Sequence, residues 1–594
     1  MSYRRKKLLA LFFAMALSMT AVAGCTGIKS STGNVVSSET ETNAEETSAQ
    51  SEAGTFSSAD MFTERDLAGT YEESGAVYVT LSDDGIAGET DGVVIDGQMV
   101  TITAEGTYIF SGTLSEGQIV VDADNAKVQI VFDNVDITCA SSAAVYVKSA
   151  EKVFVTLAEG SRNTLRNTDE YVAIDDNNID AVIFAKSDLT LNGTGSLTII
   201  SAEGHGIVSK DDLKIIGGTY DITAAGHALS GKDSVRIADG TFILTAEKDG
   251  IHAENADDEE KGYIYIADGD FTITSDGDGM DASNIVQIED GTLDITAGGG
   301  SANSLKTHES DVPGGPGGGM PQNGEKLDGE SMPQMGEKPD GENMPQDTTT
   351  DESGTSTKGI KAGGGMYLNG GTYQIDSADD SIHSNANITI ADGTYTLATG
   401  DDGVHADDAL IVNGGTITVT ESYEGLEGLA VTINDGTIDI TASDDGINTA
   451  GEKMELNGGY IHILAGGDGV DSNGDLTING GEIYIDGPSD NGNSAIDYGD
   501  RSSAYVNGGT LVAIGSSGMA EVMSDSSKQK VLMVKLGEQM EAGNVVLTDS
   551  EGNVIVSYTA LKTYDCVIIS TAEVESGATY TLTTSGTTTE VTAE

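Results

Sequence analysis

The chain has 594 residues, with 29 Lys and Arg against 97 Asp and Glu, so its formal net charge is −68. This acidity argues strongly against nucleic acid as a partner and against docking on anionic lipid, because both carry negative charge. Hydrophobic residues make up 38% of the chain and recur with a fixed period, which favours a folded protein over a disordered one.

The first 25 residues have the features of a bacterial lipoprotein signal peptide. Four basic residues, 4–7, precede an apolar run that ends in Val22-Ala23-Gly24-Cys25. We expect cleavage before Cys25 and lipidation of its thiol; the alternative is an ordinary signal peptide that happens to contain a cysteine. Residues 26–58 are rich in Ser, Thr, Glu and Asn and predict a polar tether. The expected location is the outer face of the cell membrane, contacted only through the lipid.

Residues 59–140 predict an N-terminal β cap and the first coils of a larger β structure. Short β-branched runs at 100–103, 108–110, 119–121 and 128–131 are typical of strands. Capping protects the open end of a stack of strands from pairing with another chain. Only Cys139 and Cys566 remain after the signal peptide, so no disulfide framework is expected.

Residues 141–515 repeat one unit of about 22 residues, which predicts a β-solenoid. Each unit has an aliphatic residue after a tight turn, a short strand, an Asn-Gly-Gly or Asp-Gly corner, and a second alternating strand. Stacked coils share a continuous core that a single unit cannot form. The aligned aliphatic residues are Val145, Val182, Ile207, Leu229, Ile251, Met280, Leu305, Ile360, Ile382, Val404, Leu426, Ile447, Val470 and Ile496.

Two segments depart from the repeat. Residues 308–357 hold a Pro-rich near-repeat, GEKLDGESMPQM and GEKPDGENMPQD, which predicts a low-complexity excursion or a ligand-facing flap. After about residue 515 the period is lost, and runs at 531–536, 545–548, 554–558, 567–570 and 580–584 predict a small C-terminal β module, 516–594.

The turn before each aligned aliphatic is unusually acidic, which predicts metal binding. In a solenoid these acids form ladders with a spacing of about 4.8 Å, where unscreened carboxylates repel each other. Ca²⁺ takes six to eight oxygen ligands in loose geometry and relieves that repulsion. The alternative is plain Asp-Gly turn chemistry, which explains one Asp per corner but not several. The candidate calcium ligands are Asp249, Asp276, Asp278, Asp281, Asp380, Asp402, Glu424, Glu427, Asp445, Asp468 and Asp471.

Histidines and aromatic residues give weaker signals. His252, His383 and His405 share one column and are candidates for zinc ligands or bases, or for solvated partners of the neighbouring acids. The column Tyr220, Phe242, Phe271, Tyr373 and Tyr395 is in phase with inward aliphatics, so we expect it in the core rather than on a sugar-binding surface. For stacking on sugar rings the candidates are Tyr423, Tyr484 and Tyr498.

The runs DNNIDAVIFAKSDLTLNGTGSLTI, HGIVSKDDLKI, KDGIHAEN, GDDGVHADD and GDGVDSNGDLTINGG resemble the clostridial cell-surface carbohydrate-binding family. The resemblance implies an all-β fold, a right-handed, pectate-lyase-like parallel β-helix of about 14 or more coils. It also implies bound calcium as the cofactor and affinity for cellulose-type or polygalacturonate-type polysaccharide. The charged insertion between Leu305 and Ile360 departs from this regular pattern.

Three functions remain open from the sequence. The first is a surface-anchored, calcium-binding polysaccharide-binding protein, expected to be a monomer and not an enzyme, with no catalytic residues. The second is a calcium-dependent lyase or a hydrolase of acidic glycan, for which Arg236, Lys210 and Lys232 are the basic candidates in the coils. The acids do not decide this, because a ladder offers both carboxylate spacings that hydrolases use. The third is a structural adhesin.

Overall fold

The computed structural model describes residues 55–88, 90–306, 356–451, 453–499 and 501–593. The predicted signal peptide with Cys25, almost all of the tether and nearly all of the insertion 308–357 lie outside the described residues. Gly54 to Glu594 form one compact unit. Among the described residues, no helix has the length and apolar character needed to cross a membrane.

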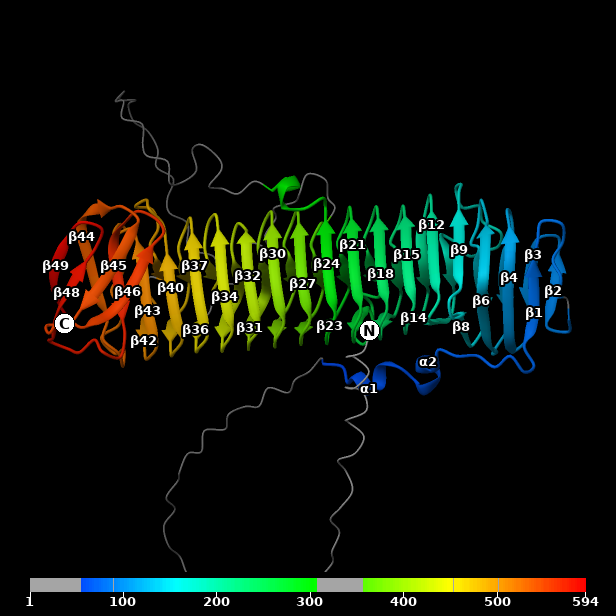
Figure 1. The fold of residues 1–594 in the computed structure, drawn as a ribbon, viewed down its shortest axis with the longest axis horizontal. Coiled ribbons are helices and arrows are strands. Elements are labelled where there is room, and N and C mark those ends of the chain that lie inside the picture. Colours follow the sequence, from blue (N-terminus) through cyan, green and yellow to red (C-terminus); the bar gives the residue numbers. More distant parts are fainter. Residues whose placement is uncertain (1–54, 89, 307–355, 452, 500, 594) are drawn as a thin grey trace, which may run out of the picture. The chain divides into compact units, whose positions relative to one another are not determined.

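Equivalent strands of successive coils pair in parallel and make three sheets, so the predicted parallel β-helix is confirmed (Figure 1). The first sheet contains β3 (Met99–Ile102), β5 (Gln118–Asp122), β7 (Val145–Ser149), β10 (Ala181–Ala185), β13 (His205–Ser209), β16 (Leu229–Gly231), β19 (Ile251–Ala253), β22 (Met280–Ala282), β25 (Ile360–Ala362), β28 (Ile382–Ser384), β31 (Val404–Val412), β33 (Leu426–Ile433), β35 (Ile447–Thr449), β38 (Val470–Ser472) and β41 (Ile496–Tyr498).

The second sheet continues through the later halves of β31 and β33. Its other strands are β1 (Val77–Leu81), β4 (Gly106–Leu114), β6 (Lys127–Thr138), β8 (Lys152–Leu157), β11 (Asp188–Gly193), β14 (Asp212–Ile215), β17 (Ser234–Ile237), β20 (Tyr263–Ile266), β23 (Val286–Ile288), β26 (Met366–Leu368), β29 (Ile388–Ile390), β36 (Met454–Leu456), β39 (Leu476–Ile478) and β42 (Ala504–Val506).

The third sheet begins where the later half of β4 pairs with the later half of β6, which in turn pairs with β9. It contains β9 (Arg162–Asn167), β12 (Ser196–Ser201), β15 (Thr219–Ala224), β18 (Thr241–Ala246), β21 (Asp270–Ser275), β24 (Thr292–Ala297), β27 (Thr372–Ser377), β30 (Thr394–Thr399), β32 (Thr416–Glu421), β34 (Thr437–Ala442), β37 (Tyr460–Ala465), β40 (Glu482–Asp486) and β43 (Thr510–Gly515).

Side-chain alternation in the third sheet fills the core. In β15 the residues Tyr220, Ile222 and Ala224 are buried, and the residues between them point outward. The predicted inward aromatic column is confirmed, because its rings are buried and stack from coil to coil. Ring centroids are 5.2 Å apart for Tyr220 and Phe242, 4.7 Å for Phe242 and Phe271, and 4.5 Å for Tyr373 and Tyr395.

The predicted aliphatic column is correct except at two positions. Ile183, not Val182, pairs with Val145 and Ile207. Leu305 is wrong: Met280 pairs directly with Ile360, and the Leu305 side chain is exposed. The repeat is interrupted between Met280 and Ile360, so aligning by spacing alone assigned Leu305 to a coil that does not exist.

Glycine makes the sharp corner between the second and third sheets. Gly393 and Gly415 have φ values of 124° and 90°, a region in which an L side chain is strained. Beside the later corners, asparagine amides donate to one another at 2.8–2.9 Å along the ladder Asn413, Asn434, Asn457, Asn479 and Asn507.

Both ends of the stack are covered. At the N-terminal end β2 (Val93–Asp96) pairs with β3 in antiparallel fashion. At the other end β47 (Tyr564–Ser570) pairs with β43 and with β44 (Leu532–Met540). A separate antiparallel sheet consists of β46 (Val554–Ala560), β45 (Gly543–Thr548), β48 (Thr579–Thr583) and β49 (Thr588–Thr592). Cys139 and Cys566 are buried free thiols.

Short helices also occur. Residues predicted as the start of the β cap instead form α1 (Ser58–Met61) and α2 (Glu64–Ala68), and η2 (Ser301–Asn303) follows β24. A capping box between Thr63 and Asp66 starts α2. The buried Asp66 carboxylate then contacts Lys152 at 2.5 Å and Thr190 at 3.0 Å, which holds α2 against the second sheet.

Candidate functional site

The predicted metal ligands lie along one edge of the stack, in the turns that connect the third sheet to the first and at the start of the strands that follow; we call this edge the acidic edge. It runs from Asp249 to Asp471 and includes ten of the predicted ligands, with Asp276 beside them as an exposed residue. The register of the first sheet places equivalent turns one coil apart. The acids are nevertheless not equivalent, because their cationic partners divide the edge into three clusters.

Histidines lie beside the acids of the N-terminal cluster. The Asp249 carboxylate lies 3.0 Å from His227 Nδ1 and 3.2 Å from His252 Nδ1. Asp281 lies 3.5 Å from His252 and 3.4 Å from Lys361. Donor atoms of His227, Asp249 and His252 lie within 4.8 Å of one another.

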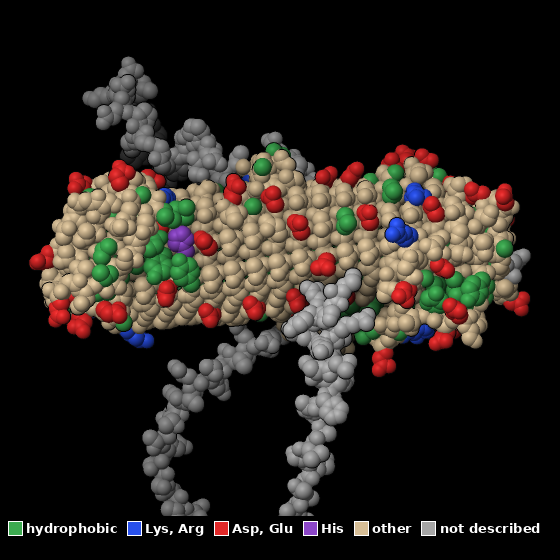
Figure 2. All heavy atoms as spheres, in the orientation of Figure 1, with side chains coloured by type: hydrophobic (Ala, Val, Ile, Leu, Met, Phe, Trp, Pro, Cys, Tyr) green, Lys and Arg blue, Asp and Glu red, His purple; other side chains and the backbone are tan. Residues whose placement is uncertain are grey.

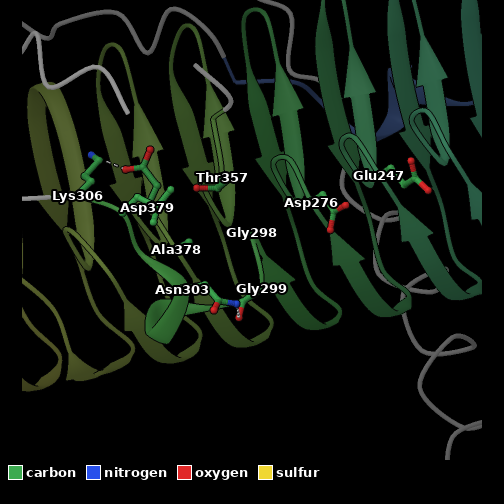
Figure 3. A pocket seen from close by; sticks show the side chains of 10 residues that line it. Glu247, Asp276, Gly298, Gly299, Asn303, Lys306, Thr357, Ala378 and Asp379 are labelled. Atoms are coloured by element: carbon green, nitrogen blue, oxygen red, sulfur yellow. Dashed lines mark hydrogen bonds and ion pairs between the residues drawn. The ribbon is translucent and has the colours of Figure 1, made fainter. Parts of the chain in front are cut away.

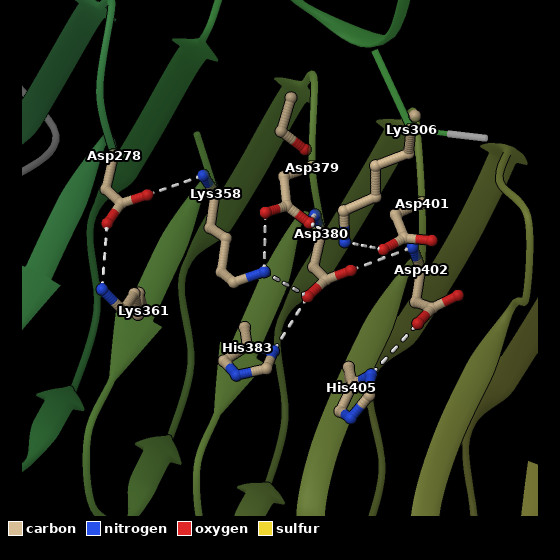
Figure 4. Close-up of polar contacts among 12 residues, drawn as sticks. Asp278, Lys306, Lys358, Lys361, Asp379, Asp380, His383, Asp401, Asp402 and His405 are labelled. Atoms are coloured by element: carbon tan, nitrogen blue, oxygen red, sulfur yellow. Dashed lines mark hydrogen bonds and ion pairs between the residues drawn. The ribbon is translucent and has the colours of Figure 1, made fainter. Parts of the chain in front are cut away.

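Lysines neutralise the middle cluster (Figure 4). Lys358 Nζ lies 2.8 Å from Asp379 and 2.7 Å from Asp380, and Lys306 Nζ contacts Asp379 at 2.6 Å and also Asp401. Burial would lower the pKa of Lys358, but the Asp380 and Asp379 carboxylates outweigh it and raise that pKa above its ordinary value. Both ammonium groups therefore stay charged and act as built-in counter-ions, which is the role predicted for Ca²⁺ here.

Other predicted ligands in the middle of the edge also have partners. Asp278 is buried, contacts Lys361 at 3.5 Å, and accepts a 2.7 Å hydrogen bond from the Lys358 backbone N–H. Burial raises its pKa to about 7. His405 bridges Asp402 at 3.0 Å and Glu427 at 2.8 Å. The Glu424 carboxylate accepts a 2.9 Å hydrogen bond from the Asn448 amide.

Carboxylates alone make up the C-terminal cluster. Oxygen atoms of Asp445, Asp468 and Asp471 lie within 4.8 Å of one another. Within the ranges that the structure describes, no Lys, Arg or His forms an ion pair with these three. Burial and the neighbouring acids raise the pKa of Asp445 to about 8, of Asp468 to about 7 and of Asp471 to about 6. An all-oxygen donor set under mutual repulsion fits Ca²⁺, so this cluster is the best calcium candidate.

A cavity of about 450 Å³ opens beside the middle cluster (Figure 3). Figure 3 places Lys306 and Asp379 on one side of it and Glu247 and Asp276 on the other. Asn303 also lines the cavity. Predicted ligand Asp276 therefore faces this cavity rather than the clusters.

A second concave surface runs across the glycine corners near the C-terminal end. This groove, of about 660 Å³, has Gly436, Gly459, Gly481 and Gly509 along it and Tyr460 as its aromatic wall. The Tyr460 side chain is 43% exposed. Figure 2 shows hydrophobic side chains gathered beside a histidine towards this end of the stack.

Two more tyrosines extend the aromatic wall; we call Tyr460, Tyr484 and Tyr558 the tyrosine platform. Ring centroids are 5.7 Å apart for Tyr460 and Tyr484 and 5.2 Å for Tyr484 and Tyr558, the latter pair stacked within 12°. Nearby, His462 Nδ1 lies 3.0 Å from Asp439 and Nε2 lies 3.8 Å from Asp486, and the Asp486 and Asp439 carboxylates raise the pKa of His462. An imidazole and carboxylates beside aromatic faces can bind sugar hydroxyls.

The three predicted sugar-stacking tyrosines do not meet. Tyr484 belongs to the platform, half-buried against Tyr558. The Tyr498 hydroxyl donates a 2.7 Å hydrogen bond to the Val522 carbonyl, and Tyr423 lies on the acidic edge, where its N–H donates to the Asp401 carbonyl at 2.6 Å.

Arg236, the basic candidate for lyase chemistry, lies away from the acidic edge on β17. Its guanidinium donates to Asp212 at 2.8 Å and to Ser234 at 2.9 Å, and lies 5.2 Å from the centre of the Tyr263 ring. These contacts hold it in the wall of the second sheet.

Sequence reasoning missed several residues of these sites, among them His227, Tyr460, Lys306 and Lys358. His227 stands two positions before Leu229, the position that is acidic in later coils, so the alignment could have found it. Tyr460 is the first residue of an alternating strand, at a position whose side chain points outward, and the sequence pattern could have shown this too. No signal marked Lys306 or Lys358 as ladder partners, because they flank an insertion that breaks the repeat.

Comparison with known proteins supports a carbohydrate-related role. A family model described as carbohydrate-binding domain-containing protein matches residues 96–403 and 400–575. A carbohydrate-binding domain-containing protein of Acetivibrio thermocellus is 40% identical over 139 residues, 23% of this chain and 49% of that protein, so the match spans about half of the relative's length. A solved structure entitled polysaccharide lyase-like protein from C. thermocellum, gadolinium derivative, is 36% identical, covers 38% of this chain and 92% of that chain, and has a TM-score of 0.37.

Proposed function

The chain belongs to the family of carbohydrate-binding domain-containing proteins, and from that premise we propose that it binds a linear polysaccharide at the groove beside Tyr460. The observation that carries the proposal is the exposed Tyr460 ring on a groove that crosses several coils. Aromatic faces stack on apolar faces of sugar rings, and glycine corners leave backbone polar groups accessible to hydroxyls. The glycan is of the cellulose or polygalacturonate type.

Calcium is the second part of the proposal. Ca²⁺ at Asp445, Asp468 and Asp471 would keep coordination positions open for water or for a uronate carboxylate, since it takes six to eight oxygen ligands. Such a bridge lets an acidic chain with a net charge of −68 hold an acidic glycan. Neutral glycan would bind at the tyrosine platform without the ion.

Substituting Tyr460→Ala is expected to weaken binding to insoluble cellulose or polygalacturonate. Loss of one stacked ring removes roughly 1 kcal/mol, about a fivefold rise in Kd. Depletion of the protein from solution over a series of polysaccharide concentrations measures this change. Chelation should abolish the binding of polygalacturonate and leave that of cellulose.

Tyr78→Ala is the matched control, because Tyr78 is 56% exposed on β1 at the opposite end of the stack. Equal binding by the Tyr460→Ala and wild-type proteins would contradict the proposed groove. Steady accumulation of 4,5-unsaturated product from polygalacturonate would favour the lyase alternative instead.

Surface anchoring is the third part, and it concerns Cys25, outside the described residues. The small residues before Cys25 and the polar tether after it support lipidation of its thiol. We expect Cys25→Ser to move the protein from the membrane fraction to the medium, as measured by immunoblotting of cell fractions. A variant that still sediments with membranes would contradict a lipid anchor at this residue.

A further inference from the structure

A cavity of about 370 Å³ lies beside the loop that joins β19 to β20, at the corner between the first and second sheets. The loop supplies Glu259, Glu260 and Lys261, β20 begins with Tyr263, and Phe56 comes from the segment before α1. Sites for small molecules have volumes of roughly 300–1,000 Å³, so this cavity is large enough for a sugar unit. It shares no residue with the groove across the glycine corners.

The floor of the cavity is apolar and aromatic. The rings of Phe56 and Tyr263 have centroids 4.3 Å apart and planes tilted by 34°. Tyr263 is 7% exposed, whereas Phe56 and Ile285 are only half-buried, so part of each of these two side chains faces the cavity. A partly exposed aromatic ring beside an aliphatic side chain suits the apolar face of a pyranose ring.

Phe56 is held in place by a residue 231 positions later in the chain. Its N–H donates to Gln287 Oε1 at 2.6 Å, and Gln287 Nε2 donates to the Phe56 carbonyl at 2.9 Å. Gln287 is 1% exposed in the middle of β23. Because both hydrogen bonds fix the backbone of Phe56, its ring needs little further ordering when a ligand binds, and the entropic cost of binding is lowered.

Two carboxylates form the polar rim. Glu259 and Glu260 are exposed, and among the described residues neither of them forms an ion pair. Their oxygens are therefore available to accept hydrogen bonds from sugar hydroxyls. The Asn284 amide fixes the loop that carries them, since it donates to the Asp258 carbonyl at 3.1 Å and to the Lys261 carbonyl at 2.6 Å.

The charges around the cavity favour a neutral ligand over an acidic one. Glu259 and Glu260 repel a uronate carboxylate. Lys261 does not offset this repulsion, because its Nζ lies 2.7 Å from Asp233. In the part of the chain that the structure describes, none of the clusters able to hold a metal ion includes a residue of this cavity, so no bridging Ca²⁺ is expected here.

We propose that this cavity is a second carbohydrate-binding site, selective for neutral pyranose units. The inference rests on the carbohydrate-binding function proposed above and adds a site at a different corner of the stack. Two sites on one chain strengthen retention on an insoluble neutral polysaccharide, because the second contact forms within a complex that already exists.

Fluorine NMR of the full chain labelled with fluorophenylalanine tests the proposal at the site itself. The Phe56 resonance is assigned by its loss in Phe56→Leu. In chelator, we expect it to shift saturably with cellotetraose, a neutral glycan, and not with tetragalacturonate. The Phe62 resonance is the internal control, because Phe62 belongs to the same segment and contacts Tyr265 outside the cavity, with centroids 6.2 Å apart.

The variant Glu259→Ala/Glu260→Ala should raise the Kd measured at Phe56 by roughly tenfold, because hydrogen bonds to charged groups are lost. Asp257→Ala is the matched control, since Asp257 is exposed on the same loop but does not line the cavity. Its Kd should equal that of the wild type. Thermal unfolding checks that each variant is folded.

An unmoved Phe56 resonance, an equal shift with tetragalacturonate, or an unchanged Kd in the folded Glu259→Ala/Glu260→Ala variant would each overturn the proposal. Tyr460→Ala separates this site from the groove. If Phe56 does not respond while calorimetry shows that Tyr460→Ala weakens cellotetraose binding, the second site is wrong and the groove stands. If Phe56 responds and Tyr460→Ala has no effect on binding, the second site stands and the groove is wrong.

Discussion

Chelating Ca²⁺ is expected to lower the melting temperature of the protein by several degrees at constant ionic strength. The reason is the C-terminal cluster, where Asp445, Asp468 and Asp471 meet without a basic partner among the described residues. A ligand that binds only the folded state at 100 times its Kd stabilises that state by about 2.7 kcal/mol. Calorimetric melting in Ca²⁺ and in chelator measures the difference.

Neutralising the cluster should abolish this response. The variant Asp445→Asn/Asp468→Asn is expected to melt at the same temperature with and without Ca²⁺, and to melt above the wild type in chelator because its acids no longer repel each other. The control Asp270→Asn/Asp294→Asn removes two exposed acids of the third sheet and should respond to Ca²⁺ like the wild type. If Ca²⁺ shifted the melting temperature equally in the wild type, the cluster variant and the control, the ion would not bind at this cluster.

The pH dependence of stability follows from the same carboxyls. Their pKa values in the fold, about 8 for Asp445, about 7 for Asp468 and about 6 for Asp471, exceed the value of about 3.9 for an unfolded Asp. Between about pH 4 and pH 8 the folded state thus binds more protons than the unfolded state, so stability in chelator should fall as pH rises. Bound Ca²⁺ should flatten that decline.

Replacing Lys358 by Met is expected to cause the largest loss of stability. Lys358 is 12% exposed and contacts Asp379 and Asp380, and the Asp380 side chain is only 2% exposed. Removing one partner of a buried ion pair costs about 3–5 kcal/mol, because the other charge stays buried without compensation. The urea midpoint of unfolding should fall accordingly.

Lys453→Met provides the matched comparison. Lys453 is 58% exposed and contacts Glu455 at 3.2 Å, so its loss should cost less than about 1 kcal/mol. Adding Asp380→Asn to Lys358→Met should restore part of the lost stability. Equal effects of the two lysine substitutions would show that burial does not strengthen the Lys358 pairs.

Several features of the fold and of the site could be predicted from the sequence because they depend on neighbouring residues. Alternation within each strand determines which side chains enter the core, so the inward placement of Tyr220 and Tyr395 followed directly. The fixed period placed equivalent acids in one row, because each coil repeats the same turn. The family resemblance is confirmed, whereas the lipid anchor at Cys25 stays a prediction.

The partners of the acids depended on the tertiary structure. Lys306 contacts Asp401 across 95 residues of sequence. No local sequence pattern predicts a contact between residues so far apart in the chain. Likewise, Tyr484 joins the platform because a tyrosine of the C-terminal module, Tyr558, stacks on it. The sequence therefore determined the positions of the acidic residues. The packing of distant segments decided which of these carboxylates already have a cationic partner and which still need a metal ion, because a buried carboxylate pairs with the cation nearest in space, wherever that cation lies in the sequence.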